Sequence, residues 1–172
     1  VKNVSPTQRH NLSISGGNEK TRFYSSIGYL NQKGLYKVGG DSYQQLNTRL
    51  SVENQTTKWM KLGFKALYTY STQDTPYTYD SKDVWKRVVY TLPTDFIQAW
   101  KKDSRYPELD RFDGMYAENN AYTLLNEGGR NKYNKHDVWT TASADFDIMK
   151  GWKAHVDFNY NVNYKKSSEH SK

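Results

Sequence analysis

Residues 152–164 read WKAHVDFNYNVNY, and their side chains alternate between two kinds. The even positions are apolar or aromatic, whereas the odd positions are polar or charged. Successive side chains of a β-strand point to opposite faces of a sheet, so this period of two predicts a strand with one apolar and one hydrophilic face. The segment is also long, because strands of soluble proteins usually have about five or six residues.

Five other segments of the chain show the same alternation. They are Asn11–Gly16, Phe23–Tyr29, Leu46–Val52, Leu62–Tyr70 and Val138–Phe146. Short connections join the six segments in pairs, at 16–20, 53–58 and 148–151. Tight connections that contain Gly or Asn are typical of antiparallel hairpins. The sequence therefore predicts an all-β protein with about six long antiparallel strands.

The other two connections are longer. Leu35–Ser42 is of intermediate length, and Thr72–Asn134 is an excursion of 63 residues. Within the excursion, apolar residues at helical spacing in Asp80–Tyr90 predict a short helix that ends before Pro93. A connection of this length inside a compact domain usually carries function. The short connections would lie at one end of the sheet and the long ones at the other.

The composition argues against several classes of protein. Only 35% of the 172 residues are hydrophobic, and no run approaches the roughly 18 apolar residues of a membrane-spanning helix. The chain has no Cys, which rules out disulfides and cysteine-bound metals, and its four histidines show no metal-ligand spacing. The net charge of +7 comes from scattered Lys and Arg residues, as on a solvated surface. We therefore expect no cofactor, no metal and no nucleic-acid partner.

Two environments suit strands with one apolar face. One is a soluble or surface-exposed antiparallel sheet, such as a carbohydrate-binding module, in which one face is wet. The other is a transmembrane β-barrel, whose outer face contacts lipid. Strand length, aromatic residues near the ends of the apolar stripes, and the unequal connections favour the barrel. Thirteen residues span about 40 Å, which a tilt near 40° reduces to the ~30 Å of a hydrocarbon core.

A sheet that spans a membrane must close, because no backbone polar group can stay unpaired in lipid. The polar face then lines a water-filled lumen, and the apolar face meets lipid. Lipid-facing residues are expected at Val156, Phe158, Tyr160 and Val162. Lumen-facing residues are expected at Arg49, Glu53, Asp145, Asp147, His155 and Asp157. The six strands are fewer than the minimum of about eight in bacterial barrels, so we expect a segment of a larger barrel.

Three stretches of the chain resemble segments of a known family. In HNLSISGGNEKTRFYSSIGYLNQKGL (His10–Leu35), a strand ends in Ser-Gly-Gly, and Glu-Lys-Thr leads into a strand that ends in Gly-Tyr-Leu-Asn-Gln. The next turn and strand are TKWMKLGF (Thr57–Phe64). In these motifs the chain resembles the SusC/RagA class of TonB-dependent outer-membrane transporters of Bacteroidetes. NNAYTLLNEGG (Asn119–Gly129) is similar to a later segment of that family, with Asn120 in place of the usual Pro.

The resemblance implies a function and a setting. A transporter of this class imports a nutrient, here an oligosaccharide or a peptide, across the outer membrane of a Gram-negative bacterium, and is not an enzyme. TonB supplies the energy through a plug, and a SusD-like surface lipoprotein covers the outer loops. Residues 1–172 would be a partial barrel, with the plug and the rest of about 22 strands outside this sequence. Residues 72–134 would form a long extracellular loop within it.

The long connection is rich in aromatic residues, which can stack on sugars or grip peptides when polar groups lie nearby. We expect contacts with the substrate or a partner at Tyr77, Tyr79, Trp100, Tyr106 and Tyr116. The alternative is that these side chains pack into a small core of the loop itself. The sequence leaves open the identity of the substrate, the oligomeric state and which of these aromatic residues play which part.

Overall fold

The computed structural model describes residues 2–77, 81–92, 101, 104–105, 107, 114–115, 121–126 and 128–170. Within these residues it contains six β-strands and two α-helices. The strands are β1 (Thr7–Gly17), β2 (Thr21–Lys33), β3 (Ser42–Thr57), β4 (Met60–Pro76), β5 (Arg130–Met149) and β6 (Trp152–His170). The helices, α1 (Ser81–Tyr90) and α2 (Ala121–Asn126), both lie between β4 and β5 in the sequence.

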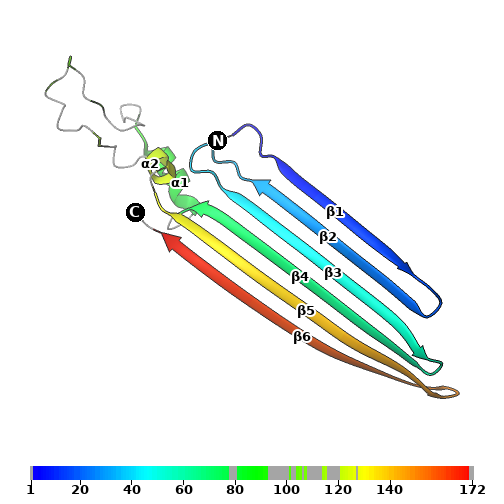
Figure 1. Ribbon diagram of the computed structural model, residues 1–172. Coiled ribbons are helices and arrows are strands. Elements are labelled where there is room, and N and C mark those ends of the chain that lie inside the picture. The colour runs from blue at the N-terminus through cyan, green and yellow to red at the C-terminus, as the bar shows by residue number, and fades with distance from the viewer. Residues whose placement is uncertain are drawn as a thin grey trace.

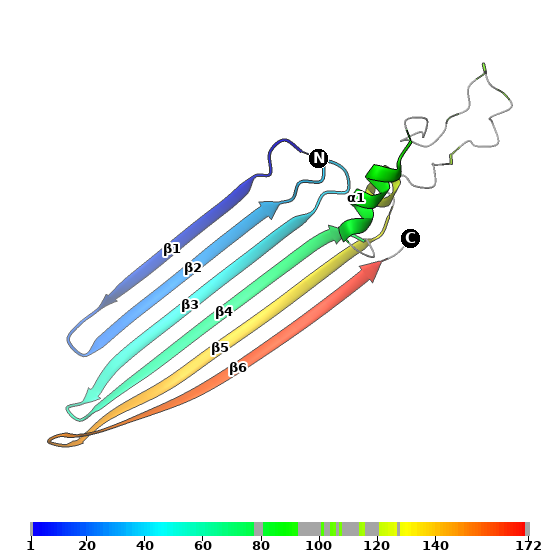
Figure 2. The ribbon, with the colours of Figure 1, turned by 180° about the vertical axis from the view of Figure 1, so that it is seen from behind.

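All six strands belong to one antiparallel sheet, in which each strand pairs with its neighbours in the sequence. The order is β1-β2-β3-β4-β5-β6, so β1 and β6 are the two edges and the sheet is open. The turns of the three short hairpins lie together at one end of the sheet, here called the turn end (Figures 1 and 2). The two helices and both ends of the chain lie at the opposite end, here called the loop end.

The six strands and three hairpins predicted from the alternation are confirmed. Each strand is longer than its apolar pattern indicated, and β5 and β6 reach 20 and 19 residues. The connection predicted at 72–134 was therefore too long, because β4 continues to Pro76 and β5 begins at Arg130. Residues 72–76 pair with 130–134, and their mainly polar side chains carry no hydrophobic period. The helix predicted at 80–90 is α1, whereas α2 was not predicted.

The register places all six apolar stripes on one face of the sheet. Directly opposed residues of an antiparallel sheet have side chains on the same side. One such row runs through Leu12, Ile27, Thr48, Tyr68, Val138 and Val162. On this face Phe158 is 68% exposed, whereas the one buried hydrophobic side chain in the described part of the chain is Val84 of α1. The described residues therefore give the apolar face no protein core to pack against.

Aromatic rings mark both ends of this apolar band. At the turn end, Trp59 stacks on Phe146 with ring centroids 6.1 Å apart. At the loop end, His136 lies among three tyrosines, Tyr68, Tyr70 and Tyr164. The Nδ1 atom of His136 is 2.9 Å from the Tyr68 hydroxyl, and its ring centroid is 4.8 Å from that of Tyr70. Beyond these rings the face becomes hydrophilic along one row of paired residues, Gln8, Asn31, Gln44, Thr72, Asn134 and Lys166.

The hairpin turns are staggered along the sheet. The β1–β2 hairpin ends at the pair of Gly17 and Arg22, whose row continues across the sheet to Ser143 and Asp157. From Asp157 the β5–β6 hairpin extends about five residues further, to Trp152, or about 17 Å along the strand. The two turns are about four strand spacings apart, roughly 19 Å, so the line joining them is inclined by about 40° to the rows of paired residues. This inclination matches the strand tilt of transmembrane barrels, about 35–45°, at which the turns would come to one level.

Arg130 holds several segments of the loop end together. Its Nε and Nη2 atoms lie 2.9 and 2.8 Å from Oδ1 of Asp74, at the end of β4. Nη2 also donates to the carbonyl oxygen of Gly40 at 2.8 Å, and Nη1 donates to that of Gly39. Gly39 has a φ of 67°, and a Cβ at this position would collide with the Leu125 carbonyl group of α2. The β2–β3 loop, α2 and the start of β5 are therefore held as one unit.

We expect Arg130→Met to loosen this unit while the sheet stays folded, because the interactions of Arg130 lie beyond the apolar band. A partly exposed ion pair contributes up to about 1 kcal/mol, so amide hydrogen exchange at residues 35–40 should rise by about fivefold. Hydrogen–deuterium exchange with mass spectrometry on the full-length protein measures this effect. Lys132→Met, two residues along the same strand, is the control, and equal exchange in the two variants would contradict the anchoring role of Arg130.

Candidate functional site

The face opposite the apolar band forms a polar wall. The six residues predicted to face a lumen all lie on it: Arg49, Glu53, Asp145, Asp147, His155 and Asp157. Asp145, for example, is directly opposite His155. The four residues predicted to face lipid, Val156, Phe158, Tyr160 and Val162, lie together on the apolar face. The structure thus brings each set to one face, and the contact of these faces with water or lipid stays a prediction.

Ion pairs cross-link the wall near the turn end. The ring of His155 lies between two carboxylates, with Nδ1 2.5 Å from Asp145 Oδ1 and Nε2 2.9 Å from Asp157 Oδ2. On the same hairpin, the ammonium group of Lys153 is 3.2 Å from Asp147. The short turn between β5 and β6 sets the register that brings these groups together. They join the two strands on their polar side, which suits a structural role in the hairpin.

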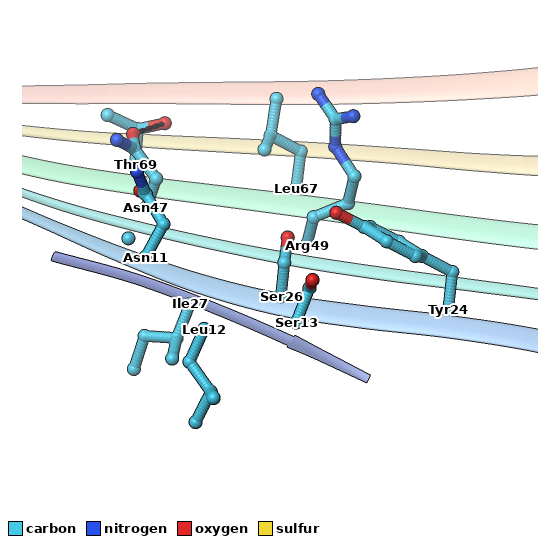
Figure 3. Close-up of a pocket in the computed structure, with 11 residues that line it drawn as sticks. Asn11, Leu12, Ser13, Tyr24, Ser26, Ile27, Asn47, Arg49, Leu67 and Thr69 are labelled. Atoms are coloured by element: carbon cyan, nitrogen blue, oxygen red, sulfur yellow. Dashed lines mark hydrogen bonds between the residues drawn. The ribbon is translucent and has the colours of Figure 1, made fainter. Parts of the chain in front are cut away.

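A hollow lies in the wall where β1 to β4 run side by side. Its volume is about 400 Å³. Figure 3 shows Tyr24, Arg49 and Leu67 projecting from the polar side, whereas Leu12 and Ile27 project from the opposite side. Five of its eleven lining residues carry hydroxyl, phenol or guanidinium groups, so the hollow presents both donors and acceptors of hydrogen bonds.

Amide groups complete the hollow at one end, where Figure 3 places Asn11, Asn47 and Thr69 close together. Oδ1 of Asn47 accepts hydrogen bonds from Gln45 at 2.9 Å and from Thr69 at 3.1 Å. Gln45 in turn accepts one from the hydroxyl of Tyr43 at 3.0 Å. This chain of hydrogen bonds orients the amides of β3, so the hollow has a rigid polar rim suited to a polar ligand.

Two residues of the wall were not predicted as site residues. Leu67 and Trp139 occupy polar positions of the alternation, and the pairing places them side by side between Arg49 and Asn161. Trp139 is 54% exposed. Both could have been identified from the sequence, because each is an apolar residue at a polar position of the alternating pattern. Together they form an apolar platform in the middle of a polar surface.

The loop aromatics are only partly within the described residues. Tyr77 directly follows β4, and its backbone N–H donates to the Gly129 carbonyl at 2.8 Å, which closes the base of the long loop. The other four predicted contacts lie outside the described residues: Tyr79, Trp100, Tyr106 and Tyr116. Their role in binding a substrate or a partner stays a prediction.

Neither described helix is long and apolar enough to cross a membrane. In the described part of the chain, no three His, Asp or Glu side chains are grouped so that they could hold a metal ion.

The sequence is similar to two curated proteins, whereas no protein-family model matches it. It is 32% identical over 167 residues to TonB-dependent receptor P39 of Formosa agariphila, and 27% identical over 160 residues to TonB-dependent receptor P26 of the same organism. These alignments cover 93% and 85% of this chain, but 14% and 15% of the two relatives. The chain thus spans about a seventh of the length of each relative. The resemblance found in the sequence motifs is confirmed.

Solved structures share the fold. The RagAB peptide importer in its open-open state matches 96% of this chain with a TM-score of 0.68 and 18% identity. In its closed-closed state it matches the same share with a TM-score of 0.64 and 16% identity. In both cases the match covers 18% of the larger chain. The predicted fold class is confirmed: the open sheet has the architecture of a barrel segment.

We expect Phe158→Arg to destabilise the intact barrel by about 2–4 kcal/mol, because a charge near the midplane of the band would enter hydrocarbon. Asn159→Arg, one residue along the strand, places the same charge on the polar wall and should cost much less. Phe158→Leu should be nearly neutral, because no close-packed protein partner is lost at a side chain that is 68% exposed.

The measurement is the unfolding free energy of the full-length protein refolded into bilayers. Equal losses for Phe158→Arg and Asn159→Arg would contradict the assignment of the two faces. A large loss for Phe158→Leu would instead indicate that another part of the protein packs on the apolar band.

Proposed function

We propose, from the similarity of this chain to a segment of TonB-dependent receptors, that the protein imports a nutrient across a bacterial outer membrane. The observation that carries this proposal is the 32% identity to a TonB-dependent receptor over 93% of the chain. In this reading the 172 residues are part of a larger barrel, and residues 77–129 form its long extracellular loop. The protein is a transporter rather than an enzyme, and it resides in the outer membrane of a Gram-negative, Bacteroidetes-like bacterium.

The surface of the sheet supports a membrane setting. An exposed apolar band lies between aromatic residues at both ends, as interfacial girdles flank the lipid-facing zone of outer-membrane barrels. The opposite face carries the charged and amide side chains, which suits a lumen filled with water. Both edge strands lack a partner in the described chain, so closure requires strands from elsewhere in the protein.

The partners follow from the same proposal. TonB would drive import through a plug that lies outside these residues, and a SusD-like surface lipoprotein would meet the outer loops. The cargo would be an oligosaccharide or a peptide, and the structural neighbours that share the fold are peptide importers. The loop aromatics, including Tyr77 at the base of the loop, would contact the cargo or the lipoprotein.

Import is tested in the native bacterium with the gene deleted and then restored on a plasmid. The probes are a fluorescent tryptic digest of serum albumin and a fluorescent mixture of oligosaccharides. We expect one probe to accumulate in restored cells and neither to accumulate after deletion of the gene or depletion of TonB. Import that persists without TonB would overturn the proposed mechanism. If the 172 residues alone form a detergent-free monomer with one cooperative melting transition, the reading as a soluble module would replace it.

We also expect the loop end to face the medium and the turn end to face the periplasm, because bacterial barrels have long outer loops and short periplasmic turns. Lys37→Cys in the β2–β3 loop and Asn18→Cys in the first turn are both at exposed positions. A membrane-impermeant maleimide applied to whole cells should label the first variant and not the second. Lysed cells are the control, in which both should react, and labelling of Asn18→Cys alone in whole cells would reverse the topology.

A further inference from the structure

In one region of the polar wall, each carboxylate already has a basic side chain beside it. Between the turn end and the row of Asp137 the wall carries five of them: Glu53, Asp137, Asp145, Asp147 and Asp157. Lys61 lies 2.9 Å from Glu53, and Lys135 lies 2.5 Å from Asp137. The pairs formed by His155 and Lys153 account for the other three. Each acidic group in this region is therefore already engaged, although one imidazole between two carboxylates leaves the cluster around His155 with a net negative charge.

Three cations in the same region form no ion pair with a described residue, and one of them, Arg22 on β2, is directly opposite Glu53. The other two are Arg49 on β3 and Lys65 on β4, of which Lys65 is a diagonal neighbour of Glu53 and attracts it without a direct ion pair. Lys65 is directly opposite Ser51, two residues from Arg49, so the two cations are diagonal neighbours about 7–8 Å apart at their backbones. A single carboxylate could lie between their side chains. The planar guanidinium of Arg49 also suits two parallel hydrogen bonds to one carboxylate.

The apolar platform adjoins these cations. Leu67 is directly opposite Arg49, and Trp139 is directly opposite Leu67 on the next strand. Trp139 is 54% exposed, and its backbone lies about 10 Å from that of Arg49, or two strand spacings. An aliphatic and an indole side chain together suit an apolar side chain of a peptide. A sugar ring stacks on an aromatic ring and needs no branched aliphatic neighbour.

We propose that Arg49, Lys65, Leu67 and Trp139 form a subsite for an acidic peptide, in which the two cations bind a carboxylate and the platform binds an adjacent apolar side chain. This inference rests on the proposed import function and specifies the kind of cargo that the polar wall would bind. The subsite lies about eight residues from the turn end, or about 20 Å above the turns at a tilt near 40°. That height is near the middle of the strands, since Arg49 lies eight residues from the turn end of β3 and seven from its loop end.

The test measures binding to the full-length protein in lipid nanodiscs. The probes are two blocked hexapeptides that differ only in having Asp or Asn next to a Leu residue. The wild-type protein should bind the Asp peptide about tenfold more tightly, as expected for a charge-assisted pair. Arg49→Gln with Lys65→Gln should bring this ratio close to one. Trp139→Ala should weaken binding of both peptides equally.

Lys153→Gln is the matched control, because it removes a wall cation that is already paired. The subsite would be overturned if this control lost the preference for the Asp peptide. It would also be overturned if the Arg49→Gln, Lys65→Gln double variant kept that preference. If the double variant bound both peptides equally more weakly, the two cations would have a structural role within the protein and would not contact the carboxylate of the peptide. Binding of a galacturonate tetrasaccharide but of neither peptide would replace the peptide with a sugar acid.

The two proposals fail in different ways. Import of peptides without any preference for the Asp peptide would overturn the subsite and leave the import function standing. If the wild-type protein imports neither probe mixture in cells, the import function fails, and the subsite fails with it.

Discussion

The backbone hydrogen-bond ladder between neighbouring strands is the interaction on which the rest of this structure depends. In the described chain the sheet has almost no buried apolar side chains, and Val84 lies in a helix rather than in a strand. A soluble sheet is stabilised largely by burying one face, whereas here the strands pair over their length while the apolar band stays uncovered. In hydrocarbon such a ladder becomes obligatory, because an unpaired backbone group costs several kcal/mol there.

Register decides which chemistry each side of the sheet presents. A slip of one residue would move every side chain to the other face and place Asp145 and Asp157 in the apolar band. Pairs on both faces oppose such a slip. His155 joins two carboxylates on the polar wall, and Tyr68 is hydrogen-bonded to His136 at the edge of the band. These contacts specify the alignment of the strands as well as stabilising it.

Much of this architecture could be predicted from the sequence, because the period of two reports directly on a sheet with unlike faces. The ends of the strands could not, since the polar side chains of 72–76 and 130–134 continue the ladder without an apolar period. The six-residue helix α2 is too short to show a helical period. Arg49 was expected on the wall from its position in the alternation. The neighbours with which it forms the proposed subsite, Lys65 and Trp139, lie on other strands, so only the register could bring them together.

The apolar band is not equally tall on all strands. From the turn to the hydrophilic row it covers about ten residues on β2 and about fourteen on β6. At a tilt near 40° these lengths correspond to roughly 25 and 35 Å of height. A bilayer adapts to such hydrophobic mismatch by local thinning or thickening, at a cost of fractions of a kcal/mol per Å. In the proposed membrane setting, lipid beside β1 and β2 would be compressed relative to lipid beside β6, so the thickness of the bilayer would change along this part of the barrel wall.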